Sequence, residues 1–105
     1  MKEIVAPEFW DHAVPLLARG EADEGTMFGM RCLRVRGEFM AMPYYDGPGL
    51  VVKLPRTRVE ALVAAELGRP IAPNGRVFKE WLHVPAYAPA LWDELLAEAR
   101  AFVTR

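Results

Sequence analysis

Hydrophobic residues recur at helical spacing near the start of the chain. Residues 7–18 begin with a proline, which suits the first turn of a helix. Apolar residues recur there at helical spacing, namely Phe9, Trp10, Ala13, Val14 and Leu17. Pro15 interrupts this pattern because it has no backbone N–H, so we expect the helix to kink or restart there. A short helix followed by a polar loop is therefore predicted.

Two later segments are also expected to be helices. In residues 55–68, Thr57 and Glu60 have the spacing of a capping box at the start, and Gly68 is typical of a helix end. The final helix is expected to begin near Pro89, because proline fits the first turn. The positions predicted to face the core are Val59, Leu62, Val63 and Leu67 in the first of these helices and Trp92, Leu95, Leu96, Ala99, Phe102 and Val103 in the second.

Between and after these helices the chain is rich in residues that favour strands. Residues 25–35, 39–45 and 50–54 are expected to form three strands joined by short turns, and residues 69–85 a short strand, an Asn-Gly turn and a longer strand. This order predicts an α+β fold with a mainly antiparallel sheet and the helices packed on it. A chain of 105 residues has the size of one domain, so residues 1–105 are expected to form a single domain.

The first predicted strand carries the only cysteine of the chain among three arginines. Its apolar residues do not alternate cleanly, and a bulge near Cys32 would leave Arg31, Arg34 and Arg36 outside. These arginines are a candidate contact for an anion or a nucleic acid, and the alternative is an ordinary solvated strand face. Cys32 is either a thiol whose pKa the arginines lower or a small buried hydrophobic residue.

The counts of charged residues, cysteines and histidines limit which partners and cofactors are expected. Thirteen basic and fourteen acidic residues give a net charge of −1, whereas a nucleic-acid binder usually has a basic excess, so nucleic acid is not the expected partner. One cysteine forms no intramolecular disulfide, and His12 and His83 lack a metal-binding spacing, so no metal or cofactor is expected. Without a signal peptide or a run of about 20 apolar residues, a cytoplasmic protein with no membrane contact is expected.

The last predicted strand contains a candidate ligand site. Alternation along it places Lys79, Trp81 and His83 on one face, and we expect Lys53 near them. A lysine, an indole and an imidazole in one place can bind an anionic or aromatic ligand. The alternative is packing, in which Trp81 covers the sheet or the final helix and the two polar residues lie at its solvated edge.

Glu80 falls among apolar neighbours in the same strand. Because an unpaired buried carboxylate is costly, we expect it to pair with Arg76 or Lys53, or to be turned outward by the twist of the strand. Glu80 and His83 fall on opposite faces of the strand, which argues against joint acid–base catalysis.

The strand segments FMAM and LVV are apolar on both faces instead of alternating with polar residues. Three short helices have enough apolar surface to cover one face of the sheet. We therefore expect the other face, including Met42 and Val51, to be buried in a homodimer.

The chain from about Gly25 onward resembles the amino-terminal domain of the TfoX (Sxy) family of bacterial competence regulators and their single-domain relatives. The most specific matches are Met27-Phe28-Gly29, Gly37 with Phe39 and Ala41, and Lys53. The resemblance implies the fold α-β(3)-α-β(2)-α and a regulatory or binding role, with no catalytic residues to transfer.

These observations lead to two functional hypotheses. The first is a non-enzymatic bacterial binding or regulatory module that acts through protein–protein contacts as a homodimer. The second is a small-molecule-binding protein or enzyme with a pocket near Lys53, Lys79, Trp81 and His83. A ligand-sized concavity lined by these side chains would favour the second hypothesis, whereas a flat, packed sheet would favour the first.

Overall fold

The computed structural model describes residues 6–105, which form three helices and one six-stranded sheet. The helices are α1 (Pro7–Ala18), α2 (Arg56–Ala64) and α3 (Pro89–Val103), and the strands are β1 (Asp23–Met27), β2 (Met30–Val35), β3 (Glu38–Pro43), β4 (Leu50–Lys53), β5 (Arg69–Ile71) and β6 (Phe78–Val84). The strands lie in the order β1-β2-β3-β4-β6-β5, with every neighbouring pair antiparallel, which confirms the predicted α+β class. Within this described part of the chain, no helix has both the length and the apolar character needed to cross a membrane.

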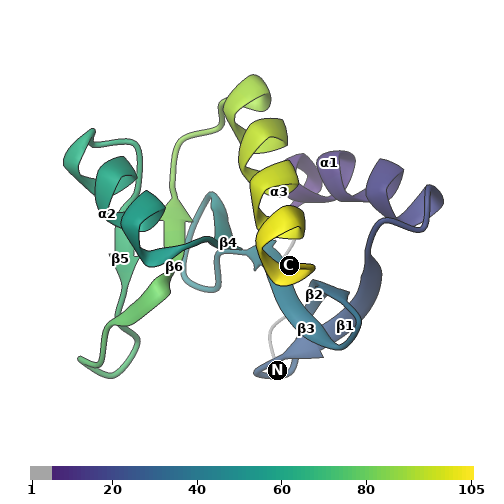
Figure 1. Ribbon diagram of the computed structural model, residues 1–105, viewed down its shortest axis with the longest axis horizontal. Helices are drawn as coiled ribbons and strands as arrows, with labels where there is room; N and C mark the ends of the chain where they lie inside the picture. Colours follow the sequence, from purple (N-terminus) through teal and green to yellow (C-terminus); the bar gives the residue numbers. More distant parts are fainter. Residues whose placement is uncertain (1–5) are drawn as a thin grey trace.

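All three helices contribute to one hydrophobic core on one face of the sheet. Helix α3 lies against β3 and β4, and α2 lies against β5 and β6 (Figure 1). Helix α1 joins this core through Phe9 and Ala13. Five of the positions predicted to face inward in the last helix are buried, namely Trp92, Leu95, Leu96, Ala99 and Val103, and Phe102 is half-buried.

The segment predicted as one first strand is a hairpin of two strands. Phe28 and Gly29 join β1 to β2, with φ angles of 55° and 76°. Two successive residues with positive φ form the type I′ turn that matches the twist of a hairpin. This turn prefers Asn, Asp or Gly at its first position, so the Phe-Gly pair gives no turn signal in the sequence. The order is therefore helix, four strands, helix, two strands, helix.

The irregularity predicted near Cys32 lies in the neighbouring strand instead. Between Leu33 and Arg34 of β2 the register with β3 shifts, leaving Met40 as the extra residue of β3. Strand β2 therefore alternates regularly, with Leu33 in the helix-covered core and Cys32 on the other face. Sequence patterning does not show which of two paired strands carries a bulge, because the register depends on both.

Helix α1 continues through Pro15, so it does not restart there, which was one of the two predicted alternatives. The missing N–H of Pro15 would have bonded the carbonyl of Asp11 in the preceding turn. Both residues are exposed, so that carbonyl can bond water instead. Val14, in the same exposed stretch, does not face the core.

Helix α2 begins without the predicted capping box. Pro55 occupies the N-cap position, and no side chain caps the helix. The Glu60 carboxylate instead accepts a hydrogen bond from Nε of Arg56 at 3.1 Å, so it does not reach back to the backbone.

The same helix ends at Ala64, before the predicted stop at Gly68. Glu66 takes a left-handed φ of 61°, and the N–H groups of Glu66 and Leu67 donate to the carbonyls of Val63 and Leu62. This is the Schellman pattern of a helix end. Leu67, predicted to face the core, is exposed as a result.

The second face of the sheet is covered by side chains of the same chain. Its buried residues are Cys32, Phe39, Met42, Val51 and Ile71, and its half-buried cover consists of Met27, Met30, Tyr44, Tyr45, Phe78 and Trp81. Met42 and Val51 are 0% exposed in a single copy. The apolar character of this face therefore does not require a partner, and the predicted homodimer cannot use these two residues as its contact.

We predict that Gly49→Ala lowers the free energy of unfolding by more than about 2 kcal/mol. Gly49 has a φ of 108°, and an added Cβ would lie 2.3 Å from the carbonyl oxygen of Val84. Gly75 is the control, because its φ is 77° but an added Cβ meets nothing within 4 Å, so Gly75→Ala should lose only about 1 kcal/mol. Urea denaturation measures the free energy of unfolding of both variants. Equal losses in the two would contradict the close contact at Gly49.

Candidate binding site

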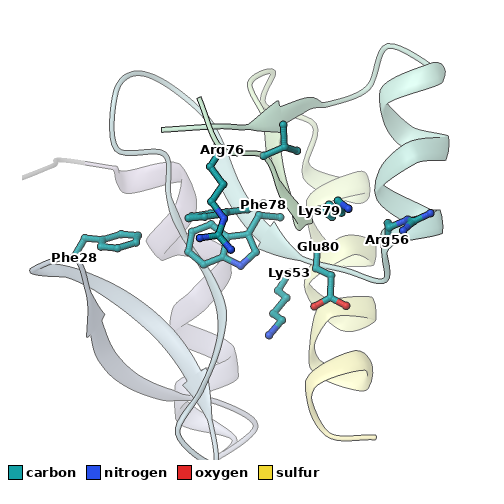
Figure 2. A pocket seen from close by; sticks show the side chains of 9 residues that line it. Phe28, Lys53, Arg56, Arg76, Phe78, Lys79 and Glu80 are labelled. Carbon is teal, nitrogen blue, oxygen red and sulfur yellow. The ribbon is translucent and has the colours of Figure 1, made fainter. Parts of the chain in front are cut away.

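A hollow of about 910 Å³ lies beside the first half of β6. Its apolar lining comes from the rings of Phe28, Phe78 and Trp81, together with Val77. Its charged lining consists of Lys53, Arg56, Arg76 and Lys79, with Glu80 as the single carboxylate. Figure 2 shows Phe28 on its own hairpin, across the hollow from Phe78 and Lys79. The site is thus assembled from the β1–β2 turn, the end of β4, the start of α2 and the segment leading into β6.

The aromatic part of the hollow is built around Trp81. The indole stacks on Phe39, with ring centroids 4.5 Å apart and an interplanar angle of 25°. Phe78 meets the indole edge-on at 5.0 Å, and Phe28 lies 6.2 Å away, tilted by 58°. Such ring pairs each contribute about 0.5–1.5 kcal/mol beyond the area they bury. Two of the three neighbours therefore hold Trp81 from within the sheet, and Phe28 approaches it from the hairpin tip.

Three of the four cations that line the hollow have no ion-pair partner among the described residues. Within residues 6–105, Lys53, Arg76 and Lys79 form no ion pair and no side-chain hydrogen bond, while Arg56 is paired with Glu60 at 3.1 Å. That pair is exposed, so it contributes little and can exchange partners. The hollow therefore keeps an excess of positive charge.

Glu80 does not form the ion pair expected for it. Its side chain is half-buried, and in the described part of the chain it is joined to neither Arg76 nor Lys53. Its backbone carbonyl accepts a hydrogen bond from the N–H of Leu54 at 2.9 Å, which extends the pairing of β4 with β6. The carboxylate thus has enough contact with solvent to avoid the penalty of full burial.

An apolar slot of about 510 Å³ adjoins the hollow on the side of α2. It shares Trp81, Phe78 and Lys79 with the hollow, and Val59 and Val63 of α2 line its other wall. The hollow and the slot together offer an apolar body next to a cationic rim. This combination is typical of sites for ligands that carry both an apolar part and a negative charge.

His83 does not belong to the hollow, although alternation grouped it with Lys79 and Trp81. Its ring is only 6% exposed, stacks on Tyr44 at 3.6 Å and lies with Nε2 3.0 Å from the carbonyl oxygen of Pro48. Burial lowers the pKa of His83 below its ordinary value, and this outweighs the raising effect of the Pro48 hydrogen bond. His83 is therefore a neutral packing residue that fastens the β3–β4 connection.

The three arginines of the first hairpin do not gather in one place. The Arg31 guanidinium lies 4.1 Å from the centre of the Trp10 ring of α1 and donates to Glu24 at 2.6 Å. Arg36 lies in the β2–β3 turn with a φ of 54°. Neighbouring strand positions point to opposite faces, so an anion or nucleic acid cannot meet a single row of arginines.

Arg34 is held by the backbone of the hairpin. It donates to the carbonyls of Thr26 and Gly37 at 2.7 and 2.6 Å. A Cβ on Gly25 would lie 2.6 Å from Cδ of Arg34, so the glycine lets the side chain cross β1. An arginine laid across an edge strand also hinders pairing with another chain.

Cys32 is fully buried on the second face of the sheet. Burial raises the pKa of its thiol, and the opposing effect of the Arg34 charge is smaller. Cys32 therefore behaves as a small hydrophobic residue, as the second of the two alternatives predicted.

Sequence patterning missed Phe28, Arg56, Arg76 and Phe78 in the hollow. Phe28 was assigned to a strand, whereas it forms the tip of a turn. Phe78 was expected on the face opposite Trp81, but the β5–β6 register shifts between Pro70 and Ile71 and the two rings come together. Local alternation gives no signal for either placement.

His12 forms a second polar cluster that the sequence did not indicate. Its Nδ1 lies 2.6 Å from a carboxylate oxygen of Asp93 and its Nε2 lies 2.9 Å from the hydroxyl of Tyr87. These partners are 81 and 75 residues away, so no spacing could have shown them. The cluster fastens α1 to α3. Among the described residues, no three His, Cys, Asp or Glu side chains come close enough together to hold a metal ion.

Comparison of the chain with protein-family models, with curated proteins and with solved structures finds no match. The resemblance to the TfoX amino-terminal domain therefore stays a prediction. The side chains that line the hollow are therefore the basis on which a function can be proposed.

We predict that His83 makes the protein less stable as the pH falls. The unfolded chain, with an ordinary histidine pKa of about 6.5, takes up the proton before the folded one does. The contribution of neutral His83 is therefore complete above about pH 6.5 and is lost as the pH falls toward the lowered pKa of the folded state. His83→Gln keeps a donor for Pro48 but does not titrate. When the pH falls from about 8 to about 5, the free energy of unfolding measured with urea should decrease less in the variant than in the wild type. Parallel pH profiles of the two proteins would contradict this role of His83.

Proposed function

We propose that this chain is a non-catalytic binding module whose hollow beside β6 holds a ligand with a negative charge and an apolar part. The observation that carries this proposal is the lining itself, in which three aromatic rings stand next to four cations and one carboxylate. Three of the four residues predicted for a ligand site, Lys53, Lys79 and Trp81, line this concavity.

The charge distribution supports an anionic ligand. Lys53, Arg76 and Lys79 have no ion-pair partner among the described residues, so their positive charges are available to a bound anion. A bound anion accepts charge-assisted hydrogen bonds from these side chains, each worth about 1.5–3 kcal/mol. The whole chain has a net charge of −1, so this excess is local to the hollow.

The apolar surface supports a ligand with a ring or an aliphatic body. Phe28 and Val77 are 62% and 52% exposed at the rim, although large apolar side chains gain free energy when they leave water. A ligand that covers them and enters the slot beneath α2 contributes about 25 cal/mol for each Å² of apolar surface buried.

The composition of the hollow supports binding rather than catalysis. Among the described residues, its lining includes no Ser, Thr, Cys, His or Tyr side chain, which favours a binding role. Glu80 is the only acid there and no second group orients it within the described chain. Phe28 and Lys53, two of the residues on which the TfoX resemblance rests, both line the hollow, which fits the binding or regulatory role that the resemblance implies.

We predict that anilinonaphthalene sulfonate, a fluorescent aromatic anion, binds the folded protein and that added salt weakens its binding. Lys79→Glu should weaken the affinity by at least about fivefold, equivalent to about 1 kcal/mol. Arg36→Glu is the matched control, since it makes the same charge change at an exposed position outside the hollow and should leave the affinity unchanged. Fluorescence titration measures all three proteins. Equal affinities for the two variants would reject the hollow as the site.

A second candidate is a homodimer that uses the same rim. The exposure of Phe28 and Val77 favours it, because exposed apolar patches often mark contacts between proteins. The second copy would then take the place of a small ligand, in keeping with a regulatory module that acts through protein–protein contacts.

For this second candidate, we predict a dimer in light scattering across a micromolar dilution series. Replacing Phe28 and Val77 together by serine should give folded monomers, because both lie on the proposed contact. Val14→Ser is the control, since Val14 is 58% exposed on α1, away from the rim. A monomer at every concentration would reject the dimer and leave the ligand as the occupant.

A further inference from the structure

Phe28 occupies a backbone position that is unfavourable for a bulky side chain. Its φ of 55° lies in the left-handed region, where a bulky side chain crowds the backbone. Asn or Gly is more favourable at the first position of a type I′ turn. The side chain is also 62% exposed, so burial offsets little of this cost. Strained residues of this kind are concentrated at ligand clamps and functional sites.

The neighbouring hairpin provides an internal reference. Arg36 has a φ of 54° at the first position of the β2–β3 turn and is followed by Gly37, just as Phe28 is followed by Gly29. The φ angles of the two turns are closely similar, at 55° and 76° in one and 54° and 82° in the other, but only Phe28 lines the hollow. The effect of strain and the effect of ligand contact can therefore be separated within one protein.

Phe28 and Trp81 form a loosely associated pair of rings, which we call the jaw. Trp81 is held by Phe39 and Phe78, whereas among the described residues the only ring partner of Phe28 is Trp81 itself. Their centroids are 6.2 Å apart and their planes are tilted by 58°, so they are not stacked on each other. A planar group stacked at about 3.5 Å from both rings would need a separation of about 7 Å. To admit it, the hairpin tip has to move by about 1 Å and the Phe28 ring has to turn from its 58° tilt until it is parallel to the indole.

The cations around the jaw favour a phosphate. The Arg76 guanidinium presents a planar fork of N–H donors, which matches phosphate oxygens, and Lys79 and Lys53 add two further charges. None of these three side chains is paired within residues 6–105. A doubly charged phosphate balances several cations better than a single carboxylate does.

We infer that the hollow binds a mononucleotide, with the base between Phe28 and Trp81 and the phosphate at Arg76, Lys79 and Lys53. This inference rests on the proposed binding function and names the ligand class for the same site. A volume of about 910 Å³ falls within the range of sites for small molecules of this size. The strain at Phe28 is then part of recognition, because the turn holds the ring over the indole before the ligand arrives.

The first experiment uses adenosine monophosphate as the probe and tryptophan fluorescence as the readout. Saturable quenching that weakens with added salt is expected, since the base stacks on Trp81 and the phosphate meets the cations. Adenosine and ribose phosphate, each carrying half of the ligand, should bind at least tenfold more weakly. Trp81→Phe should remove the fluorescence change while Trp10 and Trp92 remain. Ribose phosphate that binds as tightly as the nucleotide would overturn the role of the jaw.

The second experiment compares two turn variants. Phe28→Asn should raise the melting temperature by about 4 °C and weaken nucleotide binding at least tenfold. Arg36→Asn, the matched control, should raise the melting temperature similarly and leave binding unchanged. Unchanged affinity in Phe28→Asn would overturn the inference.

The two levels of the hypothesis fail in different ways. Salt-sensitive binding of anilinonaphthalene sulfonate without any nucleotide binding would reject the mononucleotide and leave the anionic binding site standing. If neither probe binds, the proposed function and this inference are both rejected.

Discussion

Both faces of the sheet are apolar, but the three helices lie on only one of them. The other face has to be covered by side chains of the sheet itself, because each large apolar residue left in water forgoes about 1.5–3 kcal/mol. Aromatic rings meet this need by lying across smaller residues. Trp81 covers Phe39, and Tyr44 covers His83. The position of the candidate site follows from this face, which the chain covers with its own side chains.

The site lies at the margin of this aromatic layer. In its centre, groups such as His83 and Cys32 are buried and uncharged, because low-dielectric surroundings disfavour their ionised forms. At its margin, Trp81 and Phe78 are half-buried, and charged side chains keep enough contact with water to stay ionised. Cations from β4, α2 and the approach to β6 can therefore stand beside exposed aromatic surface. An apolar floor with a charged rim is the physical result.

The charged residues divide between fastening the fold and lining the hollow. Arg34 crosses the edge strand and bonds the hairpin backbone, and Arg31 joins that hairpin to Trp10 of α1. His12 links α1 to α3 through Asp93. Three cations of the hollow, Lys53, Arg76 and Lys79, have in contrast no ion-pair partner among the described residues. Their position beside aromatic rings distinguishes this surface from an ordinary solvated face.

The sequence by itself determined the elements whose signals are local. Helical spacing of apolar residues gave three helices, runs of strand-favouring residues gave the sheet, and their order gave the α+β class. Alternation within one strand put Lys79, Trp81 and His83 on one face, and the first two of them line the hollow. These predictions succeed because periodicity of 3.6 or 2 residues reflects which side of a single element is buried.

Only the tertiary structure decided the placements that depend on two segments at once. The register of β3 against β2 moved the bulge to Met40 and sent Arg31 and Arg34 to opposite faces. The register of β5 against β6 brought Phe78 to Trp81, while pairing with β4 kept His83 under Tyr44. The turn at Phe28 formed although its sequence disfavours it, because the strands on either side fix its geometry. Strand register is set by packing across the whole sheet, so no pattern within one segment contains it.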